Sequence, residues 1–190
     1  MNDPVRESAI ATLADWCPPD PGQDALRHAV LAFLHARPDA CRRACVPGHI
    51  TASALVVGGD SADSVLLSLH PRLGRWVQLG GHCEDGDADI TAAALREATE
   101  ESGIEGLRIE PGLAAVHVHP VTCSLGVPTR HLDLQFVVRA PAGAQIAISD
   151  ESLDLRWFPA DGLPAGVDAG LLHLVETVRR RWSSGSRNPG

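Results

Sequence analysis

The sequence predicts one helix more clearly than any other, over residues 90–102, with apolar side chains on one side and Gly103 placed to end it. Glu97, Glu100 and Glu101 stand at i, i+3 and i+4 of this helix, so their carboxylates fall within an arc of roughly 100°. Three carboxylates that close repel one another and raise each other's pKa unless cations occupy the cluster. Oxygen ligands without His or Cys favour Mg²⁺ or Mn²⁺ over zinc. An ordinary solvated acidic face is the alternative interpretation.

The segments around this helix predict a mixed sheet covered by helices. The strand-like run 50–59 ends in a Gly-Gly-Asp turn signal and precedes a second apolar run at 65–69, so the two predict a β-hairpin. Gly80-Gly81 predicts another turn, directly before the loop that leads into the helix. Further strands are expected near 107–119, 131–139 and 154–158, followed by a closing helix over 169–182.

The N-terminal part of the chain predicts two more helices and no recognisable chemistry. Apolar residues recur at helical spacing over residues 5–16, and a second helix is expected over 24–36. We therefore expect a helical extension at 1–46 that packs on a main α/β domain at 47–182, with a frayed tail at 183–190.

The charge balance restricts the partners that this chain can have. The formal net charge is −8, and all sixteen cationic Lys and Arg positions are Arg. An acidic chain without a basic block is not expected to bind a nucleic-acid backbone or an anionic membrane surface. If its ligand carries phosphates, a metal ion has to mediate between the two negative partners.

The apolar and cysteine patterns also argue against secretion. No run approaches the ~18 apolar residues of a membrane span, and the N-terminus lacks the apolar core of a signal peptide. The five cysteines are odd in number and irregular in spacing, which argues against a disulfide framework. Reduced thiols fit a cytoplasmic protein.

The residues around the acidic cluster form a longer pattern, from the Gly pair through an Arg before the first Glu to a Gly after the last. It resembles the Nudix box, the signature G-x5-E-x7-R-E-U-x-E-E-x-G-U of the Nudix hydrolase family, in which U is apolar. Eight positions of this chain match that pattern: Gly81, Arg96, Glu97, Ala98, Glu100, Glu101, Gly103 and Ile104. The resemblance implies a Nudix-type α/β/α sandwich with a mixed central sheet, and the strand order from 50 to 182 agrees with it.

The loop between Gly81 and Arg96 departs from the family pattern, because it is one residue longer. Counting forward from Gly81 places the first acid of the box at Asp87, whereas counting back from Arg96 reaches Ala88. In the family, this acid helps to hold the box Arg and the loop. Either Asp87 or Asp89 is a candidate for that position.

The resemblance also implies a metal site and a reaction. Glu97, Glu100 and Glu101, with the backbone carbonyl of Gly81, would bind Mg²⁺, with Mn²⁺ as the alternative ion. The implied reaction is the hydrolysis of a diphosphate linkage in a nucleoside diphosphate derivative, in which water attacks phosphorus at this metal–carboxylate site.

The residue that accepts the proton from water varies within the family, so three candidates remain. Glu100 and Glu101 lie inside the box, and Glu151 lies in an acidic loop before the last predicted strand. Arg96 is permanently charged and is expected to orient the carboxylates.

Five further residues are candidates for binding the substrate. His131 and Asp133 alternate onto one face of a predicted strand, and His119 would join them if its strand pairs alongside. His82 directly follows the Gly pair, where phosphates would lie, and Trp76 could stack on a base. For the histidines and Trp76, a place in the core or on the surface is the alternative interpretation.

Two other functions remain open on the same fold. A non-catalytic module that binds a nucleotide or a protein would usually lose the metal-binding acids, and all three are present here. A diphosphate isomerase would need additional proton-transfer residues. The sequence therefore favours a pyrophosphohydrolase that acts on a small nucleotide derivative, with a homodimer through the apolar N-terminal helices left open.

Overall fold

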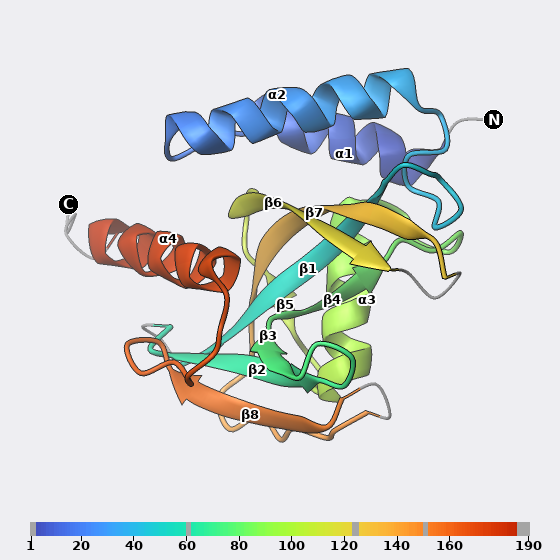
Figure 1. Ribbon diagram of the computed structural model, residues 1–190. Helices are drawn as coiled ribbons and strands as arrows, with labels where there is room; N and C mark the ends of the chain where they lie inside the picture. Colours follow the sequence, from blue (N-terminus) through green and yellow to red (C-terminus); the bar gives the residue numbers. More distant parts are fainter. Residues whose placement is uncertain (1–2, 60–61, 123–125, 150–151, 186–190) are drawn as a thin grey trace.

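The structure, a computed structural model, describes residues 3–59, 62–122, 126–149 and 152–185. Its centre is one mixed sheet of eight strands, covered by helices on both faces (Figure 1). The strands are β1 (His49–Gly58), β2 (Ser64–His70), β3 (Arg75–Val77), β4 (Leu79–His82), β5 (Arg108–Ile109), β6 (Ala115–Thr122), β7 (Pro128–Arg139) and β8 (Asp154–Pro159). The predicted mixed α/β architecture is thus confirmed.

Strand β1 is buried along its whole length and organises the sheet. On one side it pairs in parallel with β7, in a register that sets His49 opposite His131. On its other side, residues 51–54 pair with β4 and residues 56–58 pair with β2, both antiparallel. The predicted hairpin of β1 and β2 is therefore present, and β4 fills the remaining part of the same edge.

Gly80 and Gly81 lie inside β4, so the prediction of a turn at this position was wrong. Gly80 faces Ser53 of β1, where an added Cβ would come within 2.4 Å of the Ser53 backbone. Gly80 also has a φ of 147°, a conformation that side chains disfavour. The glycine signal here reflects a close approach between two strands, which in a sequence resembles a turn.

Helix α3 (Ile90–Ser102) agrees with its prediction and is capped at both ends. The Asp89 side chain accepts a hydrogen bond from the backbone amide of Ala92, and Gly103 ends the helix in the left-handed conformation, at φ 65°. The helix packs through Ala94 and Ala98 against the sheet. These caps fix the two ends of the helix that carries the acidic residues.

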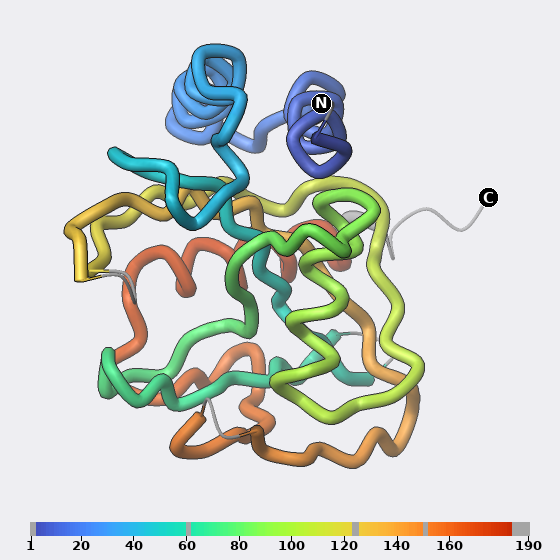
Figure 2. Tube along the Cα trace, turned by 90° about the vertical axis from the view of Figure 1, so that its right-hand side faces the viewer, coloured from blue at the N-terminus to red at the C-terminus, as the bar shows by residue number. Residues whose placement is uncertain are grey.

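Helices α1 (Pro4–Asp15) and α2 (Pro21–Ala36) are present where two helices were predicted, and they lie side by side over one face of the sheet (Figure 2). Helix α2 begins three residues before the predicted position, because Asp20 caps it and proline is favoured in a first turn. Residues 37–48 form turns that lead into β1, so the extension is helical only up to Ala36.

Helix α4 (Ala169–Gly185) covers part of the opposite face and runs past the predicted end at 182. It packs on Leu55 and Val57 of β1 and on Val137 of β7. Because side chains alternate along a strand, the same face carries the polar residues at the other end of β1 and β7. This polar end lies next to β4, and most of its side chains are buried. None of the described helices is long and apolar enough to cross a membrane.

Candidate active site at the end of β4 and on α3

Arg96 on α3 is the centre of the acidic site. Its Nε and Nη2 atoms donate to both carboxylate oxygens of Asp87, at 2.9 and 3.1 Å. Nη2 also donates to the His82 carbonyl at 2.8 Å, which ties α3 to the end of β4. Nη1 donates to Glu97 at 3.1 Å and to Glu100 at 3.0 Å. One guanidinium thus holds the loop on one side and orients two of the clustered carboxylates on the other.

The two aspartates of the lengthened loop have different roles. Asp87 is buried, binds Arg96, and accepts a hydrogen bond from the backbone amide of Glu84 at 2.7 Å. Asp89 instead caps α3 and accepts from the Thr91 hydroxyl at 2.6 Å. Asp87 therefore occupies the position that holds the Arg, and the additional residue is accommodated between it and the helix cap.

The Asp87 carboxyl gives a pH dependence of stability. Burial raises its pKa, but hydrogen bonds from Arg96 and from the Glu84 amide outweigh burial, so the net pKa lies below the ordinary value of 3.8. A depressed pKa contributes stability above the unfolded-state pKa, and this contribution is lost as the pH falls through the folded-state value. We expect the excess stability of the wild type over Asp87→Asn to be constant above pH 3.8 and to shrink below it. Urea unfolding at several pH values measures this difference, and a constant difference at every pH would contradict it.

Glu97 of α3 lies directly against Gly81 of β4. A Cβ added at Gly81 would lie 2.7 Å from both Glu97 carboxylate oxygens, so the bare glycine makes room for the carboxylate. The Glu97 side chain is only 12% exposed, whereas the Glu100 side chain is 60% exposed. Carboxylates that range from nearly buried to exposed, next to a glycine that has no side chain, suit a hard divalent cation such as Mg²⁺, which keeps some of its waters.

Gly81→Ala tests this contact. The added methyl group would displace the Glu97 carboxylate, so we expect metal-dependent activity to fall by about 10²-fold or more while most of the stability remains. Gly86→Ala is the matched control, because nothing lies within 4 Å of a Cβ at that position. Steady-state rates and melting curves of both variants provide the comparison. Equal activities of the two variants would remove the Gly81 contact from the site.

Three of the predicted substrate-binding histidines, His82, His119 and His131, lie together at the polar end of this face of the sheet. The His131 ring centroid lies 5.0 Å from that of His82 and 5.2 Å from that of His119. Burial lowers the pKa of His82 to about 4 and that of His131 to about 3, and Arg43 and the neighbouring histidines lower both pKa values further. Both rings are therefore neutral near pH 7.

His49 and Arg43 adjoin these rings and were not predicted from the sequence. His49 stands opposite His131 in the parallel register of β1 and β7, and its ring centroid lies 4.9 Å from that of His131. Arg43 Nη2 lies 2.9 Å from His82 Nδ1. Only the parallel pairing of two strands 82 residues apart brings His49 to this position, so no local sequence signal could have indicated it.

Asp133 is buried on the same face, in a network of neutral donors. It accepts hydrogen bonds from Thr51 at 2.9 Å, from Ser53 at 2.7 Å and from the Gln135 amide at 3.1 Å. None of these three donors is a cationic side chain. Its predicted contact with substrate stays a prediction.

One predicted substrate-binding residue, Trp76, lies away from the histidines. Trp76 on β3 and Phe158 form a T-shaped pair, with centroids 4.8 Å apart, and Trp76 packs at the border of the cluster under α4. This position agrees with the alternative interpretation of Trp76 as a core residue, and stacking on a substrate base stays a prediction. Glu151 lies outside the described residues.

A family model described as NUDIX domain matches residues 47–180, which is more than half of the chain. The chain belongs to the NUDIX family. It is a Nudix hydrolase whose acidic cluster and Arg96 occupy the box. A search of curated proteins gives no significant match.

Solved structures agree with the Nudix fold. An Ap4A hydrolase from C. elegans in a binary complex aligns with a TM-score of 0.56 at 19% identity, over 71% of this chain and 98% of that chain. A NUDIX family hydrolase from Clostridium perfringens aligns at 0.55 and 22% identity, over 70% and 97%. A structure described as UDP-X diphosphatase aligns at 0.53 and 19% identity, over 96% and 94%. The last alignment extends well beyond the matched NUDIX domain.

Proposed function

We propose that this Nudix hydrolase cleaves the diphosphate linkage of a nucleoside diphosphate derivative, with Mg²⁺ held by the carboxylates of α3. The observation that carries the proposal is the arrangement around Arg96, which aligns Glu97 and Glu100 while Glu97 lies against Gly81. Glu97, Glu100, Glu101 and the Gly81 carbonyl would hold the ion. When bound, the ion neutralises the diphosphate and polarises its oxygens.

The residues of the chain supply position and proton transfer. Arg96 keeps the box loop and α3 together, which fixes the carboxylates relative to the end of β4. A carboxylate that accepts a proton from the attacking water must lie within hydrogen-bond reach of it, and Glu100, Glu101 and Glu151 remain the candidates. The neutral histidines beside the box offer hydrogen-bond partners to the group beyond the diphosphate.

Two further observations support the substrate class. The chain has a net charge of −8, so a diphosphate needs a cation to bind here. The neighbours described as Ap4A hydrolase and UDP-X diphosphatase are named for nucleotide-derived substrates, and the second aligns over 96% of this chain. We also propose a cytoplasmic location, which reduced thiols at the four described cysteines would suit.

The experiment is a panel of nucleoside diphosphate sugars, dinucleoside polyphosphates and dinucleotides, each incubated with Mg²⁺, with Mn²⁺ or with a chelator. We expect a nucleoside monophosphate and a second phosphorylated product from at least one class, and no products in chelator. Binding of a panel member without cleavage under any metal condition would favour the non-catalytic module. Conversion to an isomeric diphosphate without a monophosphate product would favour the isomerase.

A further inference from the structure

Outside the carboxylates of the box, three imidazoles form a compact triangle. The ring centroids of His49, His82 and His131 are 5.0, 4.9 and 5.0 Å apart in the three pairings. They come from three different strands, β1, β4 and β7, which pair side by side through β1. One ring nitrogen from each histidine lies within 4.8 Å of the other two. The backbone of the sheet thus sets the position of all three rings.

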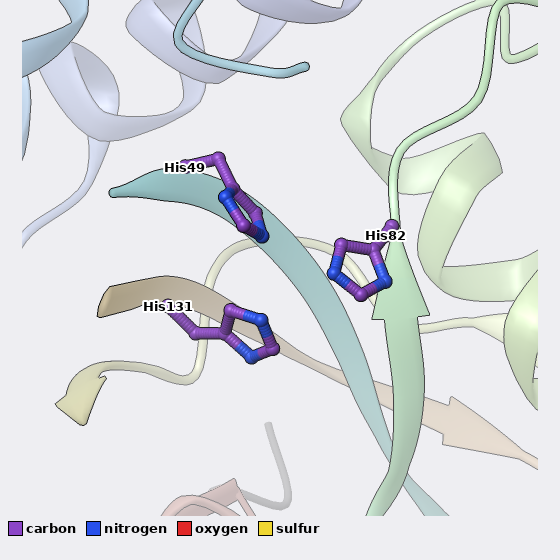
Figure 3. A group of neighbouring side chains, drawn as sticks. All are labelled: His49, His82 and His131. Carbon is purple, nitrogen blue, oxygen red and sulfur yellow. The ribbon is translucent and has the colours of Figure 1, made fainter. Parts of the chain in front are cut away.

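Two of the nitrogens in this triangle lack a partner despite their burial. His49 is 1% exposed, and its Nε2 has no hydrogen-bond partner among the described residues. The same holds for Nε2 of His131. Figure 3 shows one nitrogen of each imidazole directed into the space between the rings. A buried polar atom without a partner is costly, so two of them aimed at one point indicate that a ligand completes the site.

We propose that His49, His82 and His131 bind a divalent transition-metal ion such as Zn²⁺. Three imidazoles with an open fourth position are a ligand set that suits zinc and its neighbours, whereas Mg²⁺ prefers the oxygen ligands of the box. The inference goes beyond the proposed hydrolysis, because it assigns a second ion of different chemistry to the polar face of the sheet.

The surroundings of the triangle suit a cation. Nδ1 of His49 lies 3.5 Å from the Cys45 carbonyl oxygen, the kind of outer contact that keeps the proton on Nδ1 and leaves Nε2 free to bind. The Asp133 carboxylate, two residues from His131 on the same strand face, adds a nearby negative charge. His82 and His131 are half-buried, so two of the three side chains keep contact with solvent.

The rings have to close slightly around the ion. Tetrahedral zinc with Zn–N bonds of 2.0–2.1 Å needs its nitrogens roughly 3.3 Å apart. The nitrogens here lie within 4.8 Å of one another, so each ring has to move inward by a side-chain rotation of modest size. Such a contraction predicts a measurable gain in thermal stability on binding, because the ion binds the folded chain alone.

Arg43 competes with the ion for His82. Its Nη2 lies 2.9 Å from His82 Nδ1, and a guanidinium can only donate. This contact places the ring proton on Nε2, the side that faces the other two histidines. An ion must therefore displace either that proton or Arg43. Arg43→Met removes both the competing donor and a nearby positive charge, and we expect it to tighten zinc binding by about 10-fold.

The test is zinc and cobalt binding to the purified chain, with bound metal counted after dialysis and the Co²⁺ complex examined by visible absorption. We expect one equivalent with a tetrahedral nitrogen-ligand spectrum in the wild type. His131→Ala and His82→Ala should each weaken binding by at least about 100-fold, beyond the ~10–100-fold cost of losing an outer contact. His117→Ala, on the same strand face but outside the triangle, should bind as the wild type does.

Two controls separate this site from other zinc ligands in the chain. Glu101→Gln should leave zinc binding at the imidazoles unchanged, even if it removes hydrolysis. Cys41→Ser, Cys45→Ser and Cys83→Ser test the described cysteines that are buried or half-buried, because participation of any of these thiols would produce a sulfur-to-cobalt absorption band. Thermal melts confirm that each variant is folded before titration. Binding that survives both histidine variants, or that disappears with a cysteine variant, would overturn the proposal, as would the absence of any zinc binding.

Discussion

Glu101→Gln is expected to lower Mg²⁺-dependent hydrolysis by about 10³-fold or more, which corresponds to about 4 kcal/mol of transition-state stabilisation. The change removes one of the negative charges that hold the ion and keeps the shape of the side chain. Because the three carboxylates repel one another without metal, the melting temperature of the metal-free variant should equal or slightly exceed that of the wild type. Initial rates over a range of Mg²⁺ concentrations and melting curves in chelator measure the two effects.

Glu105→Gln is the matched control for this variant. Glu105 is exposed and lies in the turn after α3, outside the acidic cluster. We expect it to keep the wild-type rate and the wild-type dependence on Mg²⁺. If Glu101→Gln kept near-normal activity, Glu101 would be neither a metal ligand nor the base.

Arg96→Met is expected to give the largest loss of stability in the box, about 3 kcal/mol. The substitution leaves the Asp87 carboxylate, with a side-chain exposure of 4%, without its cationic partner. It also releases the His82 carbonyl and the aligned Glu97, so activity should fall together with stability. Urea unfolding at neutral pH gives the free-energy difference.

A double-mutant cycle distinguishes the pair from general damage at Arg96. Asp87→Asn removes the buried charge, so the double variant Asp87→Asn/Arg96→Met should be more stable than the sum of the single losses implies, by at least about 1 kcal/mol. Strictly additive losses would mean that Asp87 and Arg96 are not energetically coupled. Arg139, which pairs with Glu110 at the far end of β7, provides a control with a more exposed ion pair.

The sequence was informative where the signal is local. The period of α3, its capping residues and the spacing of its acids all lie within one stretch, so its bounds and its acidic face could be predicted. The hairpin of β1 and β2 likewise depends on neighbouring segments. Asp87 and Asp89 could not be separated, because their roles depend on the path of the loop in space.

The predictions that were wrong or missing concern residues that pairing between distant strands brings together. Gly80-Gly81 resembles a turn in the sequence, yet both residues lie in β4 and pair closely with β1. The triangle of His49, His82 and His131 needs three strands in register, and the register of a parallel pair is not visible in either segment alone. The fold class and the box were therefore predictable, while the composition of the polar face beside the box was not.

Hydrolysis in water enriched with oxygen-18 tests the central claim most directly. With Mg²⁺ and a cleaved member of the substrate panel, we predict that oxygen-18 enters one phosphorylated product, that the other stays unlabelled, and that chelator stops both cleavage and labelling. This result would show that water attacks phosphorus in a metal-dependent step. Cleavage that leaves both phosphates unlabelled, or that continues undiminished in chelator, would contradict the account.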